Sequence, residues 1–81
     1  METALARVRK LKAISGTASE WTKAAVAARA GCHKSHYGRI EEGVTIPRPE
    51  MAQRIADVFG GDITEQQLMY PSRYLTKPVS V

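Results

Sequence analysis

Apolar residues recur at helical spacing in several stretches of the chain. The clearest pattern lies in residues 49–59, where four positions fall at i, i+3, i+4 and i+7: Ala52, Ile55, Ala56 and Phe59. Residues 3–14 carry a second stripe at three-residue spacing, formed by Leu5, Val8 and Leu11 with Ala4 beside it. Both patterns place apolar side chains along one face of an α-helix. We therefore expect two amphipathic helices, with that in residues 49–59 in the core.

Residues 22–43 indicate two short helices, about 23–30 and 34–42, which meet at a tight turn. Their inner faces would carry Val26, Ala27 and Ala30 on the first helix and Tyr37 and Ile40 on the second. Gly31 lies between them, and glycine adopts left-handed dihedrals at little cost. Ala27 is small enough for two helices to cross closely. This combination is typical of a helix-turn-helix, whose second helix lies in the DNA major groove.

Capping signals define the helix ends. Thr3 and Thr22 are good N-cap residues, and Trp21 with Val26 fits a hydrophobic staple. Pro49 suits the first turn of a helix, and Gly60-Gly61 ends that helix. A last helix opens with a capping box at Thr64 and Gln67, a staple of Ile63 and Leu68, and a stop at Pro71. His33 is a poor N-cap, and Gly38 costs its helix about 1 kcal/mol relative to alanine.

These signals predict an all-α domain of five helices over residues 1–70. Residues 15–21 are expected to form a loop, and Gly43 is expected to follow the end of the helix before it. Residues 71–81 form a tail without helical periodicity, which suits either an extended arm or a frayed end.

Charge divides the chain into two unequal halves. Residues 1–40 hold eight Lys/Arg and two acidic residues, which gives a net charge of +6. Residues 41–81 hold four Lys/Arg and six acidic residues, which gives a net charge of −2. A basic half suits a polyanion, although solvated charges distributed by chance remain the alternative. The single cysteine excludes an internal disulfide. Cationic residues interrupt the N-terminal segment and no apolar run could span a membrane, so we expect a cytoplasmic protein.

No catalytic or metal-binding set is evident. Cys32, His33 and His36 lie close together, but a structural zinc site needs four ligands and the sequence has no second pair. Cys32 as a nucleophile would need an orienting base and a deep cleft, which a chain of 81 residues is not expected to form. We therefore expect no enzyme activity, no cofactor and no small-molecule ligand.

The segment AAVAARAGCHKSHYGRIEEGVTIPRPEMAQRIADVFGG resembles the Cro/lambda-repressor-type (XRE-like) helix-turn-helix family. The matching features cover about residues 22–61: Ala27, Gly31, the pair Tyr37 and Ile40, Glu41 with Gly43, the following proline, and the A-x-x-IA-x-x-FG helix. Three features depart from the family pattern: Tyr37 replaces a β-branched aliphatic, His33 replaces a hydroxyl or acid, and the loop before residue 22 is longer. The resemblance implies a five-helix lambda-repressor-like domain that binds double-stranded operator DNA, usually as a homodimer.

The resemblance also assigns roles by position. It places Lys34, Ser35 and Arg39 at base-contacting positions, with His36 adjacent. It places Thr22, Lys23, Thr45 and Arg48 at phosphate-contacting positions. Glu41 matches a glutamate that pairs with a basic residue of the first helix, for which Lys12 is the first candidate and Arg9 the second. The chemistry agrees, because lysine and arginine pair with the O6 and N7 acceptors of guanine, and backbone amides at a helix N-terminus suit phosphate.

Two functions from different classes follow from the sequence. The first is a small phage-type, Cro-like transcriptional repressor that binds a palindromic operator as a dimer. The second is an antitoxin or adaptor that keeps the fold and binds another protein through its last helix and tail. The expected dimer contacts are the apolar residues Leu68, Met69, Tyr70, Tyr74 and Leu75. The alternative to a dimer is a monomeric domain with a frayed tail.

Overall fold

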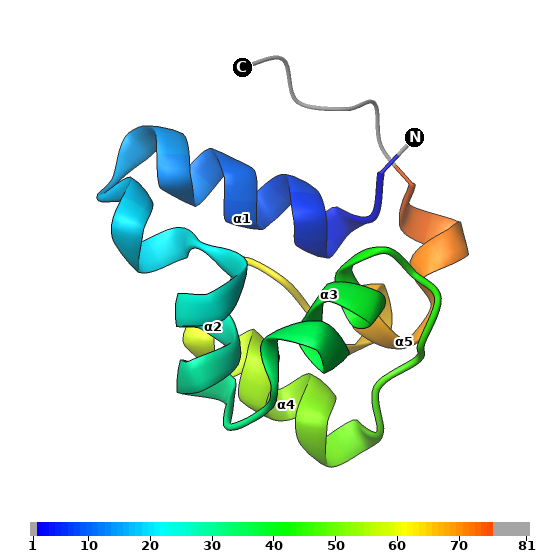
Figure 1. Ribbon diagram of the computed structural model, residues 1–81. Coiled ribbons are helices and arrows are strands. Elements are labelled where there is room, and N and C mark those ends of the chain that lie inside the picture. Colours follow the sequence, from blue (N-terminus) through cyan, green and yellow to red (C-terminus); the bar gives the residue numbers. More distant parts are fainter. Residues whose placement is uncertain (1, 76–81) are drawn as a thin grey trace.

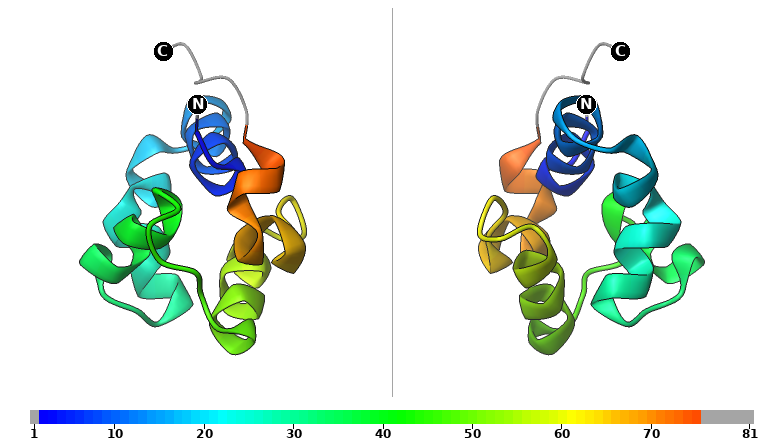
Figure 2. Two further views of the ribbon diagram at one scale, coloured as in Figure 1. Left: turned by 90° about the vertical axis from the view of Figure 1, so that its right-hand side faces the viewer. Right: turned by 90° about the vertical axis from the view of Figure 1, so that its left-hand side faces the viewer.

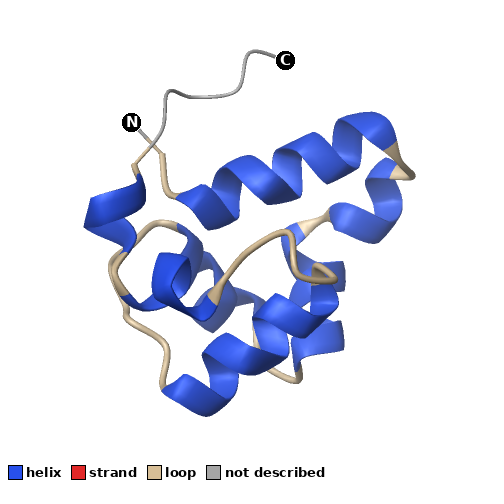
Figure 3. Ribbon diagram, turned by 180° about the vertical axis from the view of Figure 1, so that it is seen from behind, coloured by secondary structure: helices blue, strands red, loops and turns tan. Residues whose placement is uncertain are grey.

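The computed structural model describes residues 2–75, and helices form its entire framework (Figures 1 and 3). The elements are α1 (Ala4–Ser15), η1 (Ala18–Trp21), α2 (Lys23–Ala30), α3 (Lys34–Glu41), α4 (Pro49–Val58), α5 (Glu65–Met69) and η2 (Pro71–Tyr74), where η marks a 3₁₀-helix. Between residues 2 and 75 there is no β-strand. The prediction of an all-α fold with five α-helices is confirmed.

The predicted caps fix the starts of three helices. The Thr3 hydroxyl accepts a hydrogen bond from the Ala6 amide, and the Thr22 hydroxyl accepts one from the Ala25 amide. The capping box at Thr64 is complete, because its hydroxyl accepts from the amide of Gln67 and its own amide donates to the Gln67 side chain. His33 precedes α3 without a side-chain cap, as expected of histidine.

Two short 3₁₀-helices were not predicted. The expected loop at residues 15–21 contains η1, and the expected tail begins with η2. Neither segment has the apolar periodicity of an α-helix, because a single 3₁₀ turn is too short to show one. The rest of the predicted tail, residues 76–81, lies outside the described residues.

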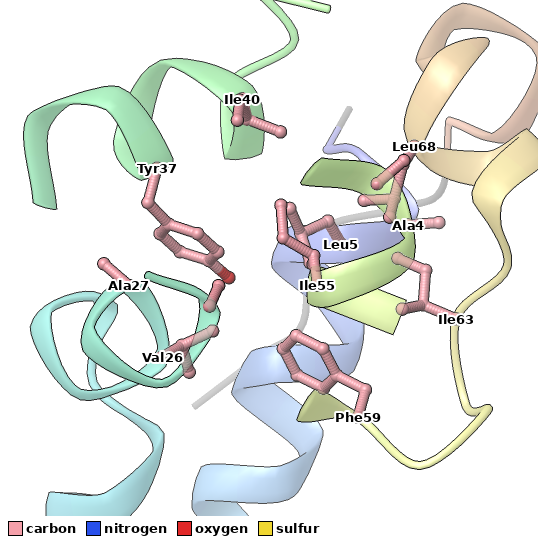
Figure 4. Close-up of a cluster of buried hydrophobic side chains, with 12 residues drawn as sticks. Ala4, Leu5, Val26, Ala27, Tyr37, Ile40, Ile55, Phe59, Ile63 and Leu68 are labelled. Carbon is pink, nitrogen blue, oxygen red and sulfur yellow. The ribbon is translucent and has the colours of Figure 1, made fainter. Parts of the chain in front are cut away.

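The five helices enclose one hydrophobic core (Figure 4). Tyr37 of α3 is completely buried and points towards Val26 and Ala27 of α2. Opposite them lie Ile55 of α4 and Phe59, the residue that directly follows α4. The other members of this core cluster are Ala4, Leu5, Ala30, Ile40, Ala52, Ile63 and Leu68. The predicted stripes of the helices are thus buried or, at Ala56 of α4, half-buried, with one exception in α1.

The exception is the C-terminal half of α1, which extends beyond the core. Leu5 is buried and Val8 is half-buried, but Leu11 is 44% exposed. The prediction that Leu11 belongs to the buried stripe is therefore wrong. Helical periodicity identifies which face of a helix is apolar, but it does not show how much of that face the neighbouring helices cover.

The arrangement leaves α3 on the outside of the molecule. Figure 2 shows α1 across one end, α2 and α3 together on one side, and α4 with α5 on the other. α2 packs against both α3 and α4, and α4 packs against α5. One face of α3 therefore covers the core while its other face is open to solvent.

Candidate nucleic-acid interface

A left-handed glycine sets the angle between α2 and α3. Gly31 has φ +79° and ψ 32°, a conformation that side chains disfavour. Its amide donates to the Ala27 and Ala28 carbonyls, and the next amide, that of Cys32, also donates to Ala27. The last carbonyls of α2 are thereby satisfied within the turn. The chain then enters α3 within three residues, as the sequence predicted.

α3 has two chemically distinct faces. Its inner face is Tyr37, Ile40 and Glu41, all buried. The four residues predicted to contact bases are all exposed: Lys34, Ser35, His36 and Arg39. The outer face therefore presents two cations, a hydroxyl and an imidazole from a single turn and a half of helix. Lysine, arginine and serine are among the side chains that can hydrogen-bond to base edges in a major groove.

The N-termini of α2 and α3 carry the wrong charge for isolated helices. The N-terminus of a helix bears a partial positive charge and favours acidic side chains. α4 and α5 follow this rule with Glu50 and Glu65 in their first turns. α2 and α3 have no acid there and begin instead with Lys23 and Lys34. α1 also lacks an acid, but its N-cap is buried. Two positive helix ends with lysines attached favour an external anion.

Two of the four predicted phosphate contacts, Thr45 and Arg48, lie beside His36, one of the predicted base contacts. They line a surface groove between α3 and α4 together with His36. Arg54 of α4 lines the same groove, and the sequence analysis did not single it out. Its position six residues after Arg48, on the polar face of α4, was the available signal. The groove thus brings two arginines from the loop and α4 to one side of α3.

The other two predicted phosphate contacts, Thr22 and Lys23, lie apart from this groove. Thr22 uses its hydroxyl oxygen to cap α2, and a hydroxyl that accepts one bond can still donate its hydrogen. Lys23 lines a separate polar hollow formed mainly by α1 and the end of α3. The structure therefore divides the predicted phosphate contacts into two groups, one at the start of α2 and one beyond α3.

The partner of Glu41 is Arg9, so the first choice of Lys12 is wrong. Arg9 donates from Nε and Nη2 to the two carboxylate oxygens of Glu41, at 2.8 Å each. Its Nη1 also donates to the Trp21 carbonyl at 3.2 Å. Lys12 pairs with Asp62 instead. The hydrogen bond to Glu41 raises the pKa of Arg9. The Glu41 side chain is buried, with 4% exposed, and the Arg9 side chain is 13% exposed.

Further contacts hold the end of α3 against α1. The Thr3 hydroxyl donates to the Glu41 carbonyl. Gly43 follows with φ +79°, and a Cβ there would lie 3.3 Å from Thr3. Burial raises the pKa of Tyr37, and the Glu41 carboxylate nearby raises it further, so its phenol stays neutral. The end of α3 is therefore held against the start of α1 by buried contacts, with the outer face of α3 on the other side.

Comparison with protein-family models identifies a helix-turn-helix model that matches residues 17–66. The chain belongs to the Cro/XRE-like helix-turn-helix family. Comparison with curated proteins and with solved structures gives no match in either case. This XRE-type protein is thus a DNA-binding transcription regulator, in a family that is generally non-enzymatic. The matched segment begins before η1 and ends within α5.

The helix-turn-helix unit contains one cysteine and two histidines at the start of α3. Cys32 is half-buried, and burial raises the pKa of its thiol. A protonated, half-buried thiol is suited to packing rather than to nucleophilic attack. Within residues 2–75, no three His, Cys, Asp or Glu side chains gather in a metal-binding arrangement. None of the helices in the same range is long and apolar enough to cross a membrane.

The five residues predicted to form a dimer contact differ in accessibility. Leu68 is 3% exposed and belongs to the core, so its side chain is not available to a second subunit. Tyr70 and Leu75 are exposed, and Met69 and Tyr74 are half-buried. Arg73 lies over the Tyr70 ring at 4.8 Å from its centroid, and the Tyr74 hydroxyl is 3.5 Å from Gln66. The exposed part of this group therefore comprises the end of α5 and η2.

Proposed function

We propose that this XRE-type regulator is a Cro-like repressor that binds a palindromic operator as a homodimer. The observation that carries the proposal is the pair of lysines at the first positions of α2 and α3. Each lysine opposes the dipole of its own helix, which costs stability in the free protein. Local costs of this kind are expected at functional sites, where a ligand offsets them. Within residues 2–75 neither lysine forms an ion pair, and a DNA phosphate or a guanine edge would offer each of them a negative partner.

The exposed side chains divide by role in the proposed complex. Lys34 and Arg39 would donate to guanine O6 and N7, while Ser35 and His36 lie between them on the same face. Thr22 and Lys23 would hold one DNA strand at the start of α2, and Thr45 and Arg48 would hold the other beside the groove. Arg54 joins the second phosphate-contacting group, because it lines the same groove as Arg48.

Specific and non-specific binding can be separated with two variants. Arg39→Ala and Lys34→Ala should each weaken binding to the preferred duplex by about 1–3 kcal/mol, because each removes a bidentate base contact. Binding to a random duplex should change much less. The preferred duplex is the one that the wild-type chain selects from a random-sequence pool, and affinities are read from gel-shift titrations.

Arg7→Ala is the matched control, because Arg7 is an exposed cation on α1 outside the proposed interface. It should affect both duplexes slightly and equally. The wild-type affinity should fall steeply as salt rises, since phosphate contacts release condensed counterions. Equal losses on both duplexes for Arg39→Ala and Lys34→Ala would show that these residues contact only phosphate. A flat salt dependence would instead favour the adaptor or antitoxin function.

A further inference from the structure

Gly38 lies in the middle of α3, on the face that bears the proposed base contacts. It follows Lys34 by four residues and Ser35 by three, which places it one turn beyond both on the same side of the helix. Apart from its two chain neighbours and the backbone of α3, nothing in the described structure lies within 4 Å of a Cβ built on Gly38. The folded chain therefore leaves room for a side chain at this position.

The other glycines differ from Gly38 in this respect. Gly31, Gly43, Gly60 and Gly61 all have positive φ, which disfavours any side chain. At Gly16 a Cβ would lie 3.1 Å from the Lys12 carbonyl oxygen. Gly38 has neither a positive φ nor a crowded neighbour. Of the six glycines in the sequence, it is the one that the geometry of the free protein does not require.

Glycine at this position has a cost. In a helix interior it is less favourable than alanine by an amount comparable to a good cap, and α3 has no side-chain cap at His33. A helix that is already weakly stabilised thus contains an unfavourable residue that the fold does not require. We therefore expect that glycine is needed at this position because α3 approaches its ligand most closely there.

We propose that Gly38 determines specificity by leaving space for the C5-methyl group of a thymine in the major groove. This inference rests on the proposed function. The exposed surface at Gly38 consists of Cα hydrogens, and its carbonyl already accepts a hydrogen bond from the Glu42 amide at 3.0 Å. Gly38 can therefore offer an apolar contact but no base-specific hydrogen bond. The thymine methyl is the apolar group that a major groove presents.

The test compares Gly38→Ala with the wild-type chain on the duplex selected from a random-sequence pool. Gly38→Ala should unfold at a higher temperature, because its Cβ enters open space and raises helix propensity. Its affinity for the selected duplex should nevertheless fall about tenfold, since the new methyl and the thymine methyl compete for one space. Gly38→Ser should also lose affinity, and Ser15→Ala, at the exposed end of α1, should leave affinity unchanged.

A second measurement identifies the contacted atom. Each thymine of the selected duplex is replaced in turn by uracil, which lacks the C5-methyl. At one position the wild-type chain should lose affinity, and there Gly38→Ala should recover most of its loss, because its own methyl fills the vacated space. Loss of affinity in Gly38→Ala without recovery at any uracil position would assign the contact to the sugar-phosphate backbone and overturn the proposal.

Unchanged affinity of Gly38→Ala for the selected duplex would overturn the proposal while leaving the proposed function intact. Failure of the wild-type chain to select any duplex would overturn the proposed function itself, and this inference with it. The two failures are distinguished because the first requires a wild-type chain that binds specifically.

Discussion

Arg9 joins three parts of the chain through one guanidinium group. It binds both oxygens of Glu41 at the end of α3 and the carbonyl of Trp21, one residue before the cap of α2. The two helices of the helix-turn-helix unit are therefore tied to α1 at opposite ends. A planar, five-donor group fits this geometry, whereas a lysine ammonium would reach one acceptor at a time.

Arg9→Ala should lower the free energy of unfolding by about 3 kcal/mol, because it leaves the buried Glu41 carboxylate without its partner. Urea unfolding followed by circular dichroism measures the change. Arg7→Ala, on the exposed face of the same helix, should stay within about 0.5 kcal/mol of the wild type. If the two variants lost similar amounts of unfolding free energy, the pair of Arg9 and Glu41 would contribute no more stability than an exposed arginine does.

At the scale of elements, the short helix α5 depends on its capping box. Five residues are too few for a stable isolated helix, so the two reciprocal hydrogen bonds at Thr64 are a large part of its local stabilisation. Thr64→Ala should therefore lower the free energy of unfolding by about 1 kcal/mol. Thr17→Ala is the matched control, because Thr17 precedes η1 without a side-chain cap hydrogen bond. If the two substitutions proved equivalent, the capping box would have no energetic role.

Caps and stripes could be predicted because they are local. The hydroxyl of Thr22 meets an amide three residues away, and Val26 lies on a face that the helical period defines. The partner of Glu41 could not be chosen in the same way, since Arg9 and Lys12 are both basic residues of α1. Which of them reaches Glu41 depends on which side of α1 faces α3. That orientation is set by the path of the chain through η1, and the sequence of α1 does not encode it.

The same distinction applies to the candidate interface. The exposure of Lys34, Ser35, His36 and Arg39 followed from the period of α3, because Tyr37 and Ile40 fix its inner face. Arg54 was missed because its nearness to His36 arises from the fold, through the loop that joins α3 to α4. The burial of Leu68 was implied by its place in the staple with Ile63, which competes with a role in dimerisation.

At the scale of the whole molecule, one copy is too small to read a palindrome. Its longest dimension is 28 Å, whereas recognition helices that read two half-sites lie about 34–36 Å apart. Two copies are therefore needed for a two-fold operator, and each must present α3 to the same face of the duplex. The exposed residues at the end of α5 and in η2 remain our proposed contact between copies.

Removal of the residues after Tyr70 should weaken the dimer and abolish cooperative operator binding, because it deletes η2 and Leu75 while retaining α5. Sedimentation and operator titration measure the two effects, and Leu68 stays in the core of both proteins. A shortened chain that dimerises and binds operator as the full chain does would exclude η2 from the assembly.

Trp21 gives this small protein a built-in optical label. It is the single tryptophan of the chain, and its ring lies 5.2 Å from that of Phe59, centroid to centroid. The Arg29 guanidinium and the Lys12 ammonium lie over it at 4.7 and 5.5 Å. The fluorescence emission of this one indole therefore depends on the contacts of Trp21 with residues of α1 and α2 and with Phe59 at the end of α4. Because these contacts lie next to the first turn of α2, the fluorescence should report both unfolding and the phosphate contact that we propose at Thr22, without an added dye.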